Sequence, residues 1–280
     1  MSEAQRGCVV TNDDGVQSEG LRRLAEVAVS AGLGVVVAAP DGEASGSSAA
    51  MTATAADGRV KVRRLSLDGL DATPAYAVAA VPAFIAFTAV RGAFGAHPAV
   101  VLSGINRGPN TGTAILHSGT VGAALTAASA GLPAAAFSLA AKAPDGPAHW
   151  DTAALVAAEV LPVLTDDLAG QVLNVNIPNV PPSALCGIRC CPLAPAGQVN
   201  LTLSDPSEDY LQIRLHDKTG APPEGSDSAL LAAGYATVTP ILGLCQGSCA
   251  GLPWPASHDS DDVVAQIPRN PAQRDQRPLR

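Results

Sequence analysis

Short continuous apolar runs alternate with segments of helical spacing through the first 180 residues of the chain. The runs predict strands buried on both faces of a sheet, because a strand with one solvent face would alternate apolar and polar side chains. They occupy residues 7–11, 34–40, 98–104, 132–139 and 171–178. The segments between them predict helices over residues 20–32, 118–131 and 150–164, the last capped by Asp151. This order predicts an α/β fold, with a Rossmann-like, doubly wound, mostly parallel sheet.

The chain between residues 51 and 94 departs from this alternation. Residues 51–67 predict a hairpin that turns at Asp57-Gly58. Residues 74–94 predict a helix that Pro82 either interrupts or restarts, because proline cannot donate a backbone hydrogen bond.

The character of the chain changes after Pro181, where short β-like runs lie among Pro, Gly, Ser and Asp. We therefore expect a Rossmann-like catalytic core over residues 1–180 and a β-rich elaboration over residues 181–256. The elaboration would cover the site or join subunits, as a homodimer or homotetramer. Residues 257–280, which combine aspartates, arginines and prolines, predict a flexible tail.

Composition narrows the classes of function. Hydrophobic residues make up 47% of the 280 positions and charged residues 15%, which is the balance of a globular protein. The net charge of −8 argues against a nucleic-acid duplex as a partner, because duplex binding needs a basic face. No apolar stretch reaches membrane-spanning length, and Glu3 and Arg6 precede only a short apolar run, so we expect a cytoplasmic protein without a secretory signal.

Six cysteines are present, at positions 8, 186, 190, 191, 245 and 249. They form no C-x-x-C pair and have no histidine at ligand spacing, which disfavours a zinc site. Cys8 lies within an apolar run and is expected to be a small core residue. A Cys186–Cys190 or Cys245–Cys249 disulfide remains open, although a cytoplasmic location disfavours it.

Polar side chains follow three of the predicted strands, at the edge where an open parallel sheet binds ligands. Asn12, Asp13 and Asp14 follow the first strand, and Ser45 lies in the loop after the second. Asn106 and Asn110 lie in the loop "SGINRGPNTG". All of these side chains supply oxygen.

The adjacent Asp13 and Asp14 predict a metal site. Two neighbouring carboxylates raise each other's pKa unless a cation shares them, and Mg²⁺ or Mn²⁺ prefers oxygen ligands. Side chains of neighbouring strand residues point to opposite faces, so both acids reach one ion only beyond the strand, where Gly15 lets the chain turn. A helix cap or a solvated turn is the simpler alternative for this short motif.

The segment "HSGTVGAALTA" predicts an anion site at the start of a helix, where Ser118, Gly119 and Thr120 present backbone N–H groups and a hydroxyl. The alternative is a tight strand-to-helix connection in which Ser118 is an ordinary cap. His117 borders this site and could protonate a leaving oxygen, or be structural. The patterns for a dinucleotide fold, a P-loop and a hydrolase elbow are all absent, which argues against those enzyme classes.

Taken together, these motifs resemble the SurE family, the stationary-phase survival phosphatases also called 5′/3′-nucleotidases. The segments that carry the resemblance run in the family's order up to about residue 242. They are "TNDDGV", "APDGEASGSS", "VVLSGINRGPNTG", "HSGTVGAALTA", "HWDTAA", "LNVNIP" and "GYATVTPI".

The resemblance implies a divalent-metal-dependent phosphomonoesterase with a β-rich C-terminal part that is used in dimerisation. Asp13, Asp14, Ser45 and Asn106 match the family's metal ligands, and Asn110 with Ser118–Thr120 matches its phosphate surroundings. Residues 42–44 differ from the family, whose loop is usually basic just before the serine. Residues 75–76 lack an expected aspartate, and the last forty residues match poorly.

The sequence therefore predicts a Mg²⁺- or Mn²⁺-dependent enzyme that hydrolyses nucleoside monophosphates or related small phosphate esters to orthophosphate. Either a metal-activated water or one of the two aspartates attacks phosphorus; the residues do not decide between these routes. A non-catalytic phosphometabolite-binding protein and a metal-dependent sugar-nucleotide transferase are the alternatives.

Overall fold

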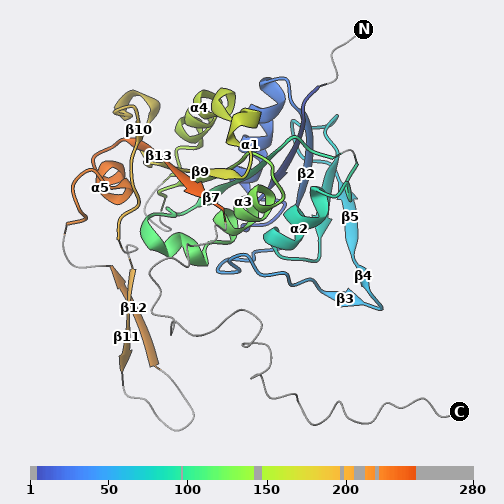
Figure 1. Cartoon of the computed structure of the whole chain (residues 1–280), viewed down its shortest axis with the longest axis horizontal. Coiled ribbons are helices and arrows are strands. Elements are labelled where there is room, and N and C mark those ends of the chain that lie inside the picture. The colour runs from blue at the N-terminus through green and yellow to red at the C-terminus, as the bar shows by residue number, and fades with distance from the viewer. Residues whose placement is uncertain are drawn as a thin grey trace, which may run out of the picture. The chain divides into compact units, whose positions relative to one another are not determined.

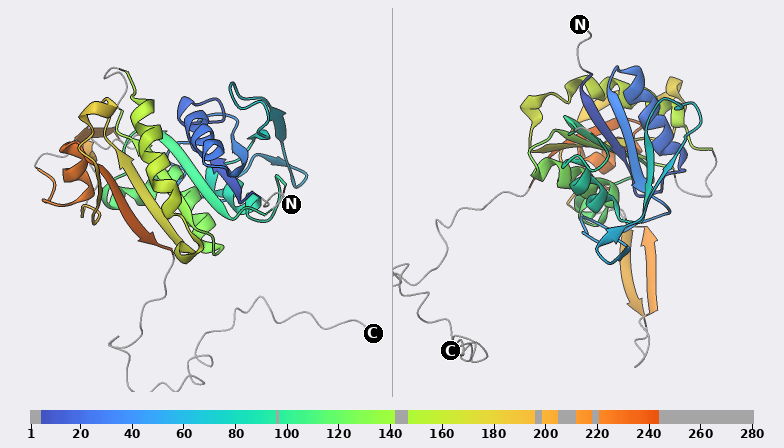
Figure 2. Two further views of the ribbon diagram at one scale, coloured as in Figure 1. Left: turned by 90° about the horizontal axis from the view of Figure 1, so that it is seen from above. Right: turned by 90° about the vertical axis from the view of Figure 1, so that its right-hand side faces the viewer.

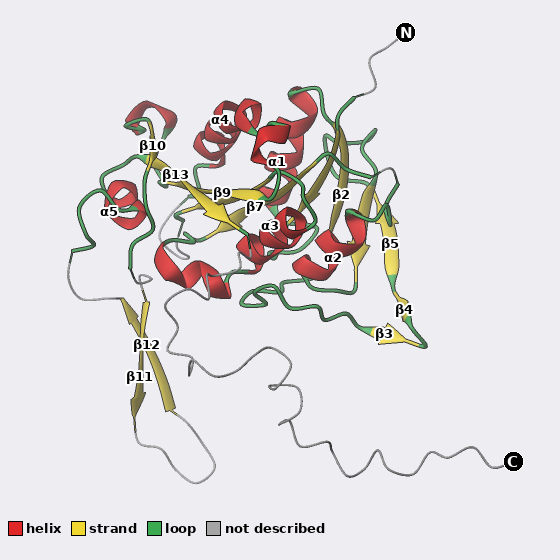
Figure 3. Cartoon of the chain, in the orientation of Figure 1, coloured by secondary structure: helices red, strands yellow, loops and turns green. Residues whose placement is uncertain are grey.

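A mixed, mostly parallel sheet forms the centre of the fold (Figure 1). The computed structural model describes residues 5–95, 97–141, 147–195, 199–204, 212–217 and 221–243, all of which belong to one compact unit. Within these residues the strands of the central sheet follow the order β10-β13-β9-β8-β7-β1-β2-β6-β5. Figure 3 separates these strands from the helices and loops by colour.

The central strands are short, and five of them overlap the five apolar runs of the sequence. They are β1 (Gly7–Thr11), β2 (Gly34–Pro40), β5 (Val62–Leu65), β6 (Ala75–Val78), β7 (Val100–Arg107), β8 (Ala134–Leu139), β9 (Gln171–Ile177), β10 (Ile188–Cys190) and β13 (Ala236–Leu242). The six strands from β9 to β6 in the sheet order are parallel to their neighbours, whereas β5 and β13 pair antiparallel with β6 and β9. The predicted α/β class is confirmed.

Among the described residues, two antiparallel strand pairs lie outside the central sheet. β3 (Ala55–Ala56) and β4 (Arg59–Val60) pair on either side of Asp57-Gly58, as the sequence predicted. β11 (Val199–Ser204) and β12 (Gln212–Asp217) form the second antiparallel pair.

Helices cover both faces of the sheet (Figures 1 and 2). They are α1 (Glu19–Ser30), α2 (Pro82–Ala89), α3 (Gly119–Ser129), α4 (Trp150–Val160) and α5 (Asp227–Ala232), with short 3-10 turns at Gly112–His117, Leu161–Val163, Asp166–Leu168 and Pro182–Ala184. α1 and α4 pack with one set of strand side chains and α3 packs with the opposite set. Period-2 alternation explains this division, because Cys8 and Val10 face α1 while Val9 faces α3.

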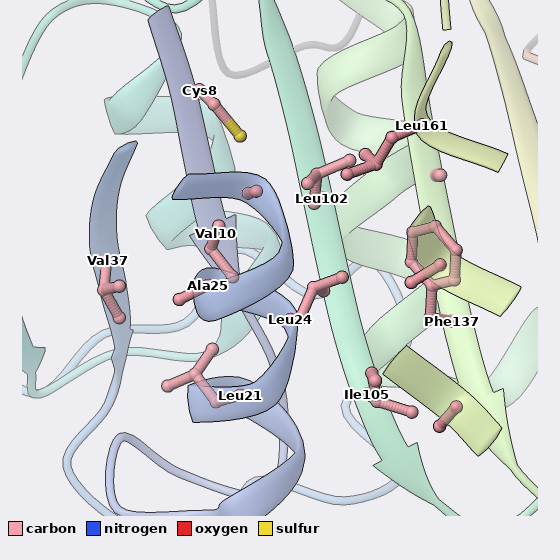
Figure 4. Packing of buried hydrophobic residues seen from close by; sticks show 14 of the residues in the cluster. Cys8, Val10, Leu21, Leu24, Ala25, Val37, Leu102, Ile105, Phe137 and Leu161 are labelled. Carbon is pink, nitrogen blue, oxygen red and sulfur yellow. The ribbon is translucent and has the colours of Figure 1, made fainter. Parts of the chain in front are cut away.

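The core on the α1 face is continuous and apolar (Figure 4). Leu21, Leu24 and Ala25 of α1 are fully buried with Leu102 and Phe137 from neighbouring strands. Their i, i+3, i+4 spacing places them on one stripe of the helix, which is why the sequence pattern located α1 correctly. Cys8 is 2% exposed, as expected for a small core residue.

Two local predictions need correction, and one helix was missed. Residues 75–78 form strand β6, because they pair with β2 and β5 in the sheet, and the helix begins only at Pro82. Asp151 does not cap α4: His149 occupies the cap position without a side-chain hydrogen bond, and Asp151 forms an ion pair with Arg23 at 3.1 Å. Helix α5 was not predicted.

The segment after residue 181 contributes directly to the central sheet. β13 pairs with β9, and β10 pairs with β13, so both extend the sheet that begins in the first 180 residues. Cys186 and Cys190 are free thiols. Cys245, Cys249 and the predicted tail at 257–280 lie outside the described residues. Of the helices that the structure describes, none is long and apolar enough to cross a membrane.

Candidate active site

The acid pair lies where β1 ends and the chain turns toward α1. Asn12 is fully buried, and its Nδ2 donates to the Gly15 carbonyl at 3.1 Å and to Ser18 Oγ at 2.6 Å. Gly15 has φ +96°, a left-handed conformation that favours glycine. This tight turn takes Asp13 and Asp14 out of the strand, as the sequence predicted. Asn12 is thus a structural residue of the turn, although its Oδ1 is buried without a hydrogen-bond partner.

Asp13 is held against the first turn of α3. Its side chain is 4% exposed, and Thr120 Oγ1 donates to Asp13 Oδ1 at 2.5 Å. A Cβ built on Gly119 would lie 2.8 Å from Asp13 Oδ2, so only glycine permits this approach. Ser118 caps the helix by accepting from the Val121 N–H at 3.2 Å. The predicted anion site therefore accommodates a carboxylate of the protein itself.

Opposing effects act on the pKa of Asp13. Burial raises the pKa, because the charged form loses its hydration. The hydroxyl and backbone N–H of Thr120 lower it, since both stabilise the carboxylate, but burial is the larger effect and the net direction is upward. The N-terminus of α3 thus stabilises the charged form without fully offsetting desolvation.

Asp14 is half-buried and faces the loop after β7. Its Oδ2 accepts the backbone N–H of Arg107 at 3.0 Å. Burial, followed by the negative charges of Asp13 and Glu43, raises the pKa of Asp14 to about 6, and the Arg107 backbone and guanidinium act in the opposite direction. Arg107 is exposed. Its guanidinium brings a positive charge to the acid pair from a distant part of the sequence.

The loop after β2 reaches the same corner of the sheet. The Ala44 N–H donates to the Asp13 carbonyl at 2.7 Å, which joins this loop to the acid pair. Ser45 is exposed, and its Oγ donates to Glu43 Oε1 at 2.8 Å. Ser47 Oγ is buried without a partner and would lie 2.7 Å from a Cβ on Gly119. Ser47 is therefore a second hydroxyl at this corner.

The two predicted asparagines do not share a loop, because β7 extends to Arg107 rather than ending at residue 104. Asn106 belongs to the end of β7, where it pairs with Ser138 of β8, and only Asn110 lies in the loop that follows. Asn106 Nδ2 donates to the Gly108 carbonyl at 2.8 Å, an arrangement that leaves its Oδ1 for a ligand. Asn110 is held by residues of β8 and β9. Its backbone N–H donates to Asn176 Oδ1 at 2.7 Å, and the Nδ2 of Asn110 donates to Ser138 Oγ at 2.8 Å. Its carbonyl accepts from Asn174 and Asn176.

Asp227 anchors the continuation of this loop. It is fully buried at the start of α5, and its carboxylate accepts the backbone N–H of Gly112 at 2.8 Å and that of Ala194 at 2.8 Å. A buried carboxylate that accepts several N–H groups is strongly stabilised. The region after residue 181 therefore positions a loop of the site, a link that the sequence pattern did not indicate.

The oxygen donors at this corner suit a hard divalent cation. Within the residues that the structure describes, no three His, Cys, Asp or Glu side chains gather in a way that could hold a metal. A cation at Asp13 and Asp14 would thus be completed by hydroxyl, amide and water oxygens, which is the chemistry of Mg²⁺ or Mn²⁺ rather than of zinc.

Sequence reasoning found the loops but missed several contacts between them. Asp13, Asp14 and Thr120 are brought together, whereas His117 is exposed at the end of a 3-10 turn. Arg107 was missed, although a basic residue inside the predicted loop could have indicated it. Ser47 and Asp227 carry no comparable local signal.

Comparisons with known proteins agree with the fold and the motifs. The family model "Survival protein SurE" matches residues 8–199. A 5′-nucleotidase SurE from Aeromonas hydrophila is 34% identical over 238 residues, covering 83% of this chain and 90% of that protein. A 5′/3′-nucleotidase SurE from Edwardsiella ictaluri is 36% identical over 246 residues, covering 83% and 88%. The crystal structure of a SurE protein from Aquifex aeolicus superposes with a TM-score of 0.69 at 29% identity, covering 84% of this chain and 93% of that one.

Proposed function

The chain belongs to the SurE family, and from that membership we propose that it is a divalent-metal-dependent phosphomonoesterase acting on nucleoside monophosphates or related small phosphate esters. It is a hydrolase of phosphoric monoester bonds, and the curated relatives carry nucleotidase names. The observation that carries the metal-dependent reaction is the position of two adjacent carboxylates, the buried Asp13 and the half-buried Asp14, at the carboxyl end of β1, with Asp13 bonded to Thr120 of α3.

The proposed metal ligands are Asp13, Asp14, Ser45 and Asn106. A cation between the two carboxylates stabilises the charged form of both, which offsets the burial that raises both pKa values. When bound, Mg²⁺ or Mn²⁺ supplies positive charge to a phosphoryl oxygen and lowers the pKa of a water molecule.

The residues of the chain then have separate tasks. Thr120 fixes Asp13 by a 2.5 Å hydrogen bond, and the side chains of Asn110 and Arg107 provide donors for the phosphoryl oxygens. A water oxygen bonds to phosphorus while the ester P–O bond breaks. The proton of that water is released to solvent and the leaving oxygen takes a proton from solvent, while Oδ2 of Asp14 accepts the Arg107 N–H and its Oδ1 is left for the cation.

Substitution of Asp13 by Asn tests the proposal. We expect Mn²⁺-stimulated hydrolysis of an aryl phosphate to fall to the rate measured with chelator. Asp167→Asn is the matched control, because Asp167 is exposed in the turn that precedes β9, at the opposite edge of the sheet. Equal rates for the wild type and Asp13→Asn would refute the proposed role of the acid pair.

Product analysis separates the alternatives. Orthophosphate and the free alcohol are expected from a nucleoside monophosphate. Release of a nucleoside diphosphate from a sugar nucleotide would instead assign the site to a transferase, and nucleotide binding without turnover under either metal would assign it to a binding protein. A phosphorylated protein trapped by acid quench would assign the attack to a carboxylate rather than to water.

A further inference from the structure

A small cavity adjoins the loop that meets the acid pair. It has a volume of about 240 Å³ and is lined by residues 40–44, 52–54 and 78–81. Pro40 ends β2 and Val78 ends β6, so the cavity opens at the carboxyl ends of these two strands. The Ala44 N–H that donates to Asp13 belongs to its lining, and we call it the loop-42 cavity.

The position and size of the loop-42 cavity suit part of a substrate. Parallel sheets bind ligands at the carboxyl ends of their strands, and this cavity and the acid pair lie on that edge together. Pockets that enclose an entire drug-sized ligand occupy about 300–1,000 Å³. A cavity of about 240 Å³ therefore accommodates a sugar or a single ring, with the phosphoryl group outside it at the acid pair.

The charge of the lining is negative. Asp41 and Glu43 are its charged residues, and the lining contains neither Lys nor Arg. Asp41 accepts a hydrogen bond from Arg63 at 2.5 Å, which compensates its charge, whereas Glu43 accepts only the neutral hydroxyl of Ser45 within the described residues. Carboxylates accept and cannot donate, so they favour ligand hydroxyl or amino groups and repel a second phosphate.

We propose that the loop-42 cavity binds the alcohol part of the substrate, an uncharged group rich in hydrogen-bond donors such as the sugar or base of a nucleoside monophosphate, and that Glu43 disfavours substrates with a second phosphate. This inference rests on the proposed function and names its substrate class. Thr52 and Thr54 line the same cavity with exposed hydroxyls, which provide further polar contacts for a sugar.

Charge reversal at Glu43 provides the first test. The measurement is the ratio of kcat/KM for a nucleoside 5′-monophosphate to that for the corresponding 3′,5′-bisphosphate. We expect Glu43→Arg to lower this ratio by about tenfold and Glu43→Gln by about threefold, with both effects shrinking at high salt. Glu159→Arg is the matched control, because Glu159 is exposed near the C-terminal end of α4, at the opposite edge of the sheet.

An unchanged ratio in Glu43→Arg would overturn the inference. An equal change in Glu159→Arg would overturn it as well, since the effect would then come from net charge. The ratio between two substrates cancels any general loss of activity that follows from the broken Ser45–Glu43 hydrogen bond.

Substitution of Gly42 by Phe provides a steric test that needs no turnover. A Cβ on Gly42 meets no atom within 4 Å, so a side chain begins there in open space, next to the cavity that Gly42 lines. We expect Gly42→Phe to weaken binding of the unphosphorylated nucleoside at least about tenfold by calorimetry, while binding of orthophosphate with Mn²⁺ stays the same. Unaltered nucleoside binding would reject the cavity as its site. Absence of hydrolysis in the wild type would refute the proposed function alone, because nucleoside binding is measured independently.

Discussion

Gly122 of α3 tests how closely the helix and the loop after β2 must pack. A Cβ built on Gly122 would lie 2.1 Å from the Ser48 carbonyl oxygen and 2.7 Å from the Ala49 nitrogen. Ordinary van der Waals contact begins at 3.4 Å, so the loop has to move by about 1.3 Å to accept alanine. Because this loop also carries Ser45 and bonds to Asp13, the displacement reaches the acid pair.

Two opposing effects determine the outcome of Gly122→Ala. Alanine favours the helix over glycine by about 0.8–1.0 kcal/mol, which would stabilise the protein. Overpacking costs about 1–3 kcal/mol, and the upper end applies because the atoms in contact are backbone. We therefore expect the free energy of unfolding to fall by about 1–2 kcal/mol, which lowers Tm by roughly 2–8 °C.

We also expect Gly122→Ala to lower the catalytic activity. A misplacement of about 1 Å costs up to about a hundredfold in rate, so we expect kcat/KM for an aryl phosphate to decrease by roughly 10–100-fold. Thermal unfolding and steady-state assays with saturating Mn²⁺ measure both quantities. Ser129→Ala, an exposed position at the other end of α3, is the control and should retain both. A fully active Gly122→Ala variant with a raised Tm would refute the reasoning.

Three further perturbations address the acid pair and its support. Thr120→Val removes the hydroxyl that donates to the buried Asp13. A hydrogen bond to a charged group contributes about 1.5–3 kcal/mol, so Mn²⁺ binding should weaken at least about tenfold in a metal titration. Unchanged affinity would contradict the role of this contact. The pKa of Asp14 is raised to about 6, so below that pH a proton competes with the metal. Mn²⁺ affinity should therefore fall about tenfold per pH unit below 6 and level off above it, and a flat profile would exclude Asp14 as a ligand. Asp227→Asn leaves a buried backbone N–H facing an amide, so we expect the free energy of unfolding in urea to fall by about 2–4 kcal/mol. The kcat should also fall, because Gly112 belongs to the loop of the site. Wild-type stability would show that this contact does not hold the loop.

The local pattern located the elements whose neighbours are also local. α1 was predicted from the spacing of Leu21, Leu24 and Ala25, because amphipathic periodicity reports directly which face is buried. β6 was mistaken for helix, since a short Ala- and Val-rich segment has no decisive period and its strand conformation depends on pairing with β2 and β5. The β-like run that contains β13 was recognised, but its place in the central sheet was not, because its partner β9 is distant in the sequence.

The candidate site divides in a similar way. The sequence alone determined that acids and amides lie where the strands end, at one edge of the sheet, because strand ends and glycine turns can be predicted from neighbouring residues. Only the tertiary structure decided that Thr120 donates to Asp13 across 107 positions and that Arg107 donates to Asp14 across 93. Such contacts depend on how closely packed layers bring loops together, and burial then sets the charge state of each acid. Periodicity is a property of neighbouring residues, whereas desolvation and hydrogen bonding are properties of the assembled fold.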